Sequence, residues 1–169
     1  MVTGMIRELY DYHRWANRRL FGIAADLGDG VTMRDMGKHW SFPTIKGMFA
    51  HLYGADRIWL SRWTGAPPAR MAGDADFASM SELRATWDAL EAEQRAFVDG
   101  LSASDLARPL AYTNNQGIHA EVALAPLLQH VVNHGTHHRS EIATMLTLIK
   151  ESPPDTGMNT WVLRRAGRR

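Results

Sequence analysis

The chain has 169 residues, a formal net charge of +1, 45% hydrophobic residues, 22% charged residues and no cysteine. This length suits one domain over residues 1–169, and the near-neutral charge argues against a broad nucleic-acid surface. Because cysteine is absent, disulfides and thiolate metal ligands are excluded, so a bound metal would need imidazole, carboxylate or water.

Hydrophobic spacing predicts two long helices in the first part of the chain. The first is expected over about 5–25, where apolar residues recur at steps of three and four until Gly28 and Gly30 interrupt the pattern. The second is expected to follow Thr44, whose hydroxyl suits an N-cap, and to continue to about Trp63. The stretch TGAPPARMAGDAD after it is rich in helix breakers and predicts a loop.

A third helix, a hairpin and a fourth helix follow. Ser79 and Glu82 have capping-box spacing, so the third helix is expected to start there and to reach about Leu101. Apolar residues on both sides of NNQG predict a short β-hairpin from about Leu110 to Ala120. A fourth helix is expected over about Val122 to Ile149.

These elements predict an all-α fold, a four-helix bundle with a long crossover connection and a short β-hairpin before the last helix. The long connection between the second and third helices permits them to run parallel. Residues 154–169 form a C-terminal segment that ends in the basic tail RRAGRR. We expect the tail RRAGRR to be a solvated, frayed terminus, and a nucleic-acid arm is the less favoured interpretation of it.

The last helix carries a histidine cluster in the stretch QHVVNHGTHHRSEI. On a helical wheel, His138 lies about 30° and His134 about 70° from the centre of the apolar stripe. His130 and His137 lie more than about 100° from that centre, on the solvent side. His134 and His138 are therefore expected to point inward from successive turns, a spacing that suits two ligands of one metal.

Two histidines need a partner from another helix to make a metal site. The zincin motif HExxH is excluded, because glycine follows His134 where that motif has glutamate. His51 borders the apolar stripe of the second helix, and His13 lies on the inner seam of the first. For each of these histidines the competing interpretation is a buried imidazole that is satisfied by a hydrogen bond.

Three stretches resemble the DinB/YfiT-like family: LYDYHRWANRRLF, SFPTIKGMFAHLYGADRIWLSRWTG and HVVNHGTHHRSEI. The resemblance covers about 5–149. It implies a four-helix bundle, commonly a homodimer, with zinc or nickel on three histidines. Those positions match His51, His134 and His138, whereas His13 stands where the family often has asparagine and is expected to be a neighbour of the site.

The chain departs from the family after the arginine of the last motif. Ser140 and Glu141 stand where the family has glycine and glutamine. Glu141 falls about 20° from His134 on the wheel, on the metal side of the helix. It is expected to be a fourth ligand, an acceptor behind a ligand or a general base, unless it is only a partly exposed carboxylate.

A metal on three neutral histidines keeps open positions, at which it lowers the pKa of a bound water or thiol. We therefore expect a metal-dependent hydrolase or a transferase that uses an external low-molecular-weight thiol. The alternatives are a non-catalytic metal-binding or stress-response bundle and a metal-free interaction bundle. Aromatic residues line either a pocket beside the metal or, more often, the core: Tyr10, Trp15, Trp59 and Trp63.

Neither secretion nor membrane insertion is predicted. No stretch approaches the roughly 18 apolar residues of a membrane span, and the first residues lack the apolar core of a signal peptide. We expect a cytoplasmic protein without a membrane partner. The substrate is expected to be a small molecule of unknown identity.

Overall fold

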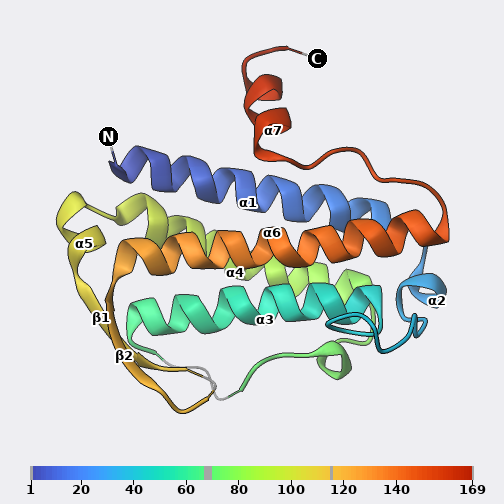
Figure 1. Ribbon diagram of the computed structural model, residues 1–169, viewed down its shortest axis with the longest axis horizontal. Coiled ribbons are helices and arrows are strands. Elements are labelled where there is room, and N and C mark those ends of the chain that lie inside the picture. The colour runs from blue at the N-terminus through green and yellow to red at the C-terminus, as the bar shows by residue number, and fades with distance from the viewer. Residues whose placement is uncertain (1, 67–69, 115, 169) are drawn as a thin grey trace.

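Four long helices make up most of the chain in a computed structural model that describes residues 2–66, 70–114 and 116–168 (Figure 1). Their bounds are Val2–Ala25 for α1, Ile45–Thr64 for α3, Met80–Gly100 for α4 and Leu124–Ile149 for α6. These ranges confirm the four helices that the hydrophobic spacing predicts. They also confirm the predicted fold class, an all-α bundle with a small hairpin before the last long helix.

Two of the predicted helix starts are capped by the expected side chains. The Thr44 hydroxyl accepts a hydrogen bond of 2.8 Å from the Gly47 N–H, which fixes the start of α3. The Ser79 hydroxyl accepts one of 3.1 Å from the Glu82 N–H at the start of α4. The Glu82 carboxylate reaches back to the Ala78 N–H, one residue earlier than a capping box requires.

The helices run in two parallel pairs. In Figure 1, α3 and α4 both begin at the end of the bundle where α1 finishes, so they run opposite to α1 and α6. Helix α1 packs against α4 and α6, and α3 packs against the same two helices, which places α1 and α3 at opposite corners. The connection between α3 and α4 is therefore a parallel crossover, as its length permits.

A two-stranded antiparallel hairpin precedes α6. Strand β1 (Pro109–Thr113) pairs with β2 (His119–Ala123), with Tyr112 opposite Ala120. Leu110 is buried, and the Tyr112 ring lies 5.2 Å from the ring of Trp59 on α3. The hairpin is thus held beside the C-terminal end of α3.

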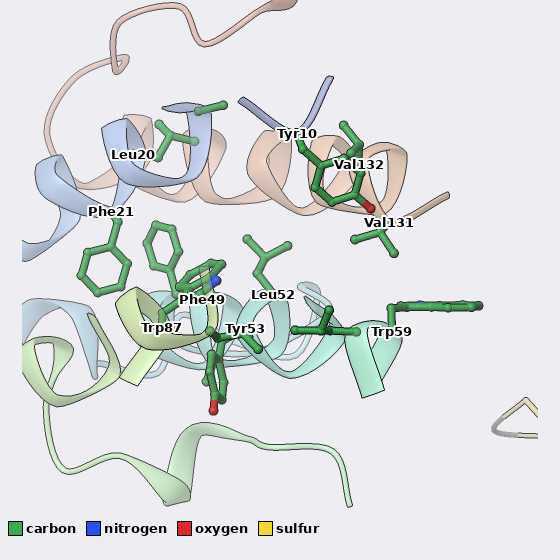
Figure 2. Close-up of a cluster of buried hydrophobic side chains, with 14 of the residues drawn as sticks. Tyr10, Leu20, Phe21, Phe49, Leu52, Tyr53, Trp59, Trp87, Val131 and Val132 are labelled. Carbon is green, nitrogen blue, oxygen red and sulfur yellow. The ribbon is translucent and has the colours of Figure 1, made fainter. Parts of the chain in front are cut away.

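Aromatic side chains from three helices form one end of the core (Figure 2). Phe21 of α1 lies 4.9 Å from Phe49 of α3 and 6.3 Å from Trp87 of α4, measured between ring centroids. All three side chains are almost completely buried. Burial of each large apolar side chain stabilises the fold by about 1.5–3 kcal/mol, so these rings contribute strongly to the attachment of α4.

Short helical segments appear where the sequence predicts none. They are α2 (Asp29–Thr32), a 3-10 turn (Asp74–Asp76), α5 (Ala103–Ala107) and α7 (Met158–Arg165). Each of α2, α5 and the 3-10 turn is too short to show a hydrophobic period. Gly30 lies within α2 and therefore does not prevent a helical turn.

Helix α7 was not predicted for the C-terminal segment, and its last turn includes Arg164 and Arg165 of the basic tail that was expected to be frayed. Its Trp161 is buried, with its ring 6.1 Å from that of Tyr12 on α1, and the Arg165 guanidinium lies 4.8 Å from the Trp161 ring. One anchored aromatic residue therefore orders this segment. Arg164, Arg165 and Arg168 remain exposed, and Arg169 lies outside the described residues.

None of the helices in the described part of the chain combines the length and apolarity that a bilayer crossing requires.

Candidate metal centre

Two neighbouring antiparallel helices bring three histidines together. His51 lies near the start of α3, and His134 and His138 lie one turn apart in the middle of α6. His138 is buried and the other two are half-buried, so the group lies at the edge of the core rather than within it. His130 and His137 are exposed, in agreement with the helical wheel.

The Nε2 atoms of the three histidines face a common point. The Nε2 atom of His134 lies 3.1 Å from Nε2 of His51 and 3.1 Å from Nε2 of His138. Two nitrogens bound to a tetrahedral zinc at 2.0–2.1 Å are separated by about 3.3 Å, so these spacings are close to those of a metal site. The donor set therefore fits a divalent ion such as zinc or nickel.

The surroundings keep these imidazoles neutral near pH 7. Burial, reinforced by repulsion from His138, lowers the pKa of His51 from 6.5 to about 4. Burial and the neighbouring histidines lower the pKa of His134 to about 3. Burial also lowers the pKa of His138, although Glu141 partly opposes this shift. Neutral imidazoles have the lone pairs that metal binding requires.

Glu141 orients His138. Its Oε2 atom lies 2.8 Å from Nδ1 of His138, and its Oε1 atom accepts hydrogen bonds of 3.1 and 2.9 Å from the Ser41 N–H and hydroxyl. Burial opposes ionisation of Glu141, but these donors hold the pKa of its carboxyl below the usual value. As a carboxylate, Glu141 accepts the Nδ1 proton of His138, which directs the Nε2 lone pair toward the other histidines.

A second possible donor group overlaps the first. His137, His138 and Glu141 also place ligand atoms close together, but His137 is exposed and its Nε2 atom lies 3.9 Å from the Glu141 carboxylate. Within this group Glu141 faces Nδ1 of His138 at 2.8 Å, on the opposite side of the ring from the Nε2 atom that faces His134. The geometry therefore favours the group formed by His51, His134 and His138.

His13 belongs to a separate buried network. Its Nε2 atom lies 3.2 Å from Oδ1 of Asp56, and its Nδ1 atom lies 3.2 Å from Nη1 of Arg139. Because arginine can only donate, Nδ1 accepts and the Nε2–H donates to Asp56. The other Asp56 oxygen accepts a bond of 3.1 Å from the Trp87 indole N–H, and Arg139 also donates to Asn17. Both ring nitrogens of His13 are thus engaged within this network and do not face the three histidines.

Gly135 allows this network to lie directly against α6. A Cβ atom at position 135 would lie 2.5 Å from Cε1 of His13 and 3.0 Å from Nη1 of Arg139. Both side chains are buried and hydrogen-bonded, so neither can move away easily. The glycine between His134 and Thr136 is therefore required by close packing.

Aromatic rings lie beside one of the three candidate ligands, His51, and beside the exposed His130. Phe42 stacks on His51 with 4.5 Å between ring centroids, and Trp59 contacts the edge of His130 at 5.2 Å. Tyr10 and Trp63 are core residues with almost no exposure. Four aromatic residues were expected either in a pocket beside the metal or in the core. Among them, Trp59 is the one whose ring contacts a histidine of α6.

The model of the DinB family matches residues 1–160. The chain belongs to the DinB family. Protein DinB of Bacillus subtilis (strain 168) is 28% identical over 163 residues, which cover 89% of this chain and 91% of that protein. The resemblance to this family is thereby confirmed.

Two features of this DinB-family chain were not predicted from its sequence. Asp56, which accepts from His13, and Trp87, which donates to Asp56, lie 31 positions apart on different helices. The available signal was a lone acidic residue among the apolar residues of LYGADRIWL, which indicates a buried carboxylate with a partner. The hydrogen bonds from Ser41 to Glu141 could not be predicted from the sequence, because they depend on how the loop before α3 folds over α6.

Proposed function

We propose that this DinB-family chain is a divalent-metal enzyme whose ion, zinc or nickel, is held by His51, His134 and His138. The observation that carries the proposal is the convergence of their Nε2 atoms, with 3.1 Å from His134 to each of the other two. The lowered pKa values of the three imidazoles and the placement of Glu141 behind His138 support it.

Three protein ligands leave coordination positions for water or substrate. Glu141 is engaged by His138 and Ser41, and His13 is engaged by Asp56 and Arg139, so neither is positioned to fill them. When bound, such an ion lowers the pKa of a coordinated water or thiol and polarises substrate oxygens. Open positions support catalysis more than a purely structural role.

Within this proposal the reaction is a hydrolysis or a thiol transfer. The chain contains no cysteine, so a thiol nucleophile has to be an external low-molecular-weight compound. The side chains of the site have separate tasks. Glu141 holds the His138 proton at Nδ1, while Phe42 on His51 shields one side of the centre from water.

The proposal is tested by comparing metal-free protein with protein loaded with zinc or nickel. Panels of esters and amides test hydrolysis, and electrophiles offered with small thiols test transfer. We expect turnover only in the loaded protein and its loss in His138→Ala, with His137→Ala as the matched control. Tight metal binding without turnover in either panel would instead favour the non-catalytic metal-binding or stress-response role.

We also propose that two copies of the chain associate. Helix α7 exposes apolar side chains, with 44% of Val162 and 41% of Leu163 accessible. Exposed apolar residues clustered on one helix are typical of a contact surface. Light scattering after size-exclusion chromatography should give the mass of a dimer, and the mass of one chain would refute the association.

A further inference from the structure

Beyond the three histidines, the last turns of α3 carry an arginine that rests on two aromatic rings. The Arg62 guanidinium lies 4.7 Å from the ring centroid of Trp59 and 5.2 Å from that of Tyr112 on β1. Its Nη2 atom donates a hydrogen bond of 3.1 Å to the Thr113 carbonyl. Two aromatic faces and one backbone acceptor therefore hold the planar group in place before any ligand arrives.

This cation lacks a carboxylate partner within the described ranges. Burial lowers the pKa of Arg62, and the opposing influence comes from the Tyr112 hydroxyl rather than from an acidic residue. Glu121 on β2 pairs with Ala111, so it lies on the opposite face of the hairpin from Tyr112. Nε and Nη1 of Arg62 form no hydrogen bond with a described residue, so one edge of the guanidinium remains for a ligand.

A continuous row of contacts joins Arg62 to the candidate metal centre. The Trp59 ring lies 5.2 Å from that of His130, and the His130 ring lies 6.1 Å from that of His134. Since α3 and α6 are antiparallel neighbours, this row follows the line along which the two helices meet. His51 and Arg62 lie eleven positions apart on α3, about 16 Å along the helix axis, so a molecule that contacts both the metal centre and Arg62 would have the length of roughly five extended residues.

We propose that Arg62 binds a carboxylate of the substrate, about five extended residues from the atom that reacts at the metal centre. Carboxylate geometry matches two adjacent N–H groups of a guanidinium, and the rings beneath Arg62 lower the entropic cost of fixing it. The substrate class is thus an elongated small molecule with a carboxylate at its far end. This inference rests on the proposed metal-dependent function.

Hydroxamates test the inference without knowledge of the natural substrate, because a hydroxamate binds an open zinc site. The probes are acetohydroxamate and a series of linear dicarboxylic monohydroxamates with lengthening methylene chains, each beside its methyl ester. Dissociation constants are measured by calorimetry on the zinc-loaded full chain. At the best length we expect the acid to bind about tenfold more tightly than the ester, the size of one charge-assisted pair.

Variants assign this preference to Arg62. Arg62→Gln should remove it while leaving acetohydroxamate affinity unchanged, and Arg62→Lys should keep part of it. Arg57→Gln is the matched control, because Arg57 is also a half-buried arginine of α3 but faces the groove toward α4. Equal affinity for acid and ester, or a preference that survives in Arg62→Gln, would overturn the inference alone. Failure of acetohydroxamate to bind would overturn both the open metal centre and this inference.

Discussion

The carboxylate of Glu141 lies 2.8 Å from Nδ1 of His138, on the side of the imidazole opposite the atom that faces His134. This relationship makes Glu141 an acceptor behind a candidate ligand. A carboxylate in this position fixes the tautomer of the histidine and raises its basicity as a ligand. Among the roles open to Glu141 from the sequence, the geometry favours this one over direct coordination.

We expect Glu141→Gln to weaken zinc affinity by about tenfold and Glu141→Ala by up to about a hundredfold, because the amide oxygen can still accept from His138 but carries no charge. Competition with a chromogenic chelator measures both constants. Complete loss of metal in Glu141→Gln would identify Glu141 as a ligand. Unchanged zinc affinity in both variants would show that Glu141 does not orient His138 for metal binding.

Substitution of the exposed histidines should leave metal binding intact. The His137 side chain is 69% exposed, and His130 lies on the same solvent-facing side of α6. We expect His130→Ala and His137→Ala to retain zinc affinity within about twofold, since lost surface contacts are small. Chelator competition on each variant checks this expectation. Loss of metal in His137→Ala would instead favour the group that His137 forms with His138 and Glu141.

Gly135→Ala should destabilise the bundle. The new methyl group would overlap His13, which is held between Asp56 and Arg139, and such overpacking costs about 1–3 kcal/mol. Urea denaturation gives the free energy of unfolding.

The control is Gly22→Ala in α1. A Cβ atom there would meet no other atom within 4 Å. This substitution should stabilise the protein by about 0.5–1 kcal/mol through helix propensity. If both variants change the free energy of unfolding in the same direction, close packing is not the reason that position 135 requires glycine.

Acid should destabilise the metal-free protein through its histidines. Unfolded imidazoles bind protons near pH 6.5, whereas His51 and His134 in the folded state do so only near pH 4 and 3. The unfolded state therefore binds more protons between these limits, and stability falls as the pH is lowered through that window. The urea midpoint should be clearly lower at pH 5 than at pH 7. In His134→Gln the urea midpoint should decrease less between pH 7 and pH 5 than in the wild type. An equal or larger decrease would contradict the assignment of this acid sensitivity to His134.

Long amphipathic patterns predicted the bundle because four helices each repeat an apolar stripe over many turns. Helix α7 escaped this reasoning, since a single buried contact between Trp161 and Tyr12 orders it rather than a repeated pattern. The wheel separated inward from outward histidines because that property is local to one helix. The sequence could not predict which side chains from other helices meet them, such as Ser41 and Asp56, because loop geometry and helix pairing decide those contacts.

Metal content tests the central claim most directly. The measurement is plasma mass spectrometry on full-length protein purified without a histidine tag, with wild type beside His134→Ala. The account predicts about one equivalent of zinc or nickel per wild-type chain and none in the variant, because His134 lies 3.1 Å from both other candidate ligands. No metal in the wild type after incubation with zinc and nickel, or equal metal in both proteins, would contradict the account.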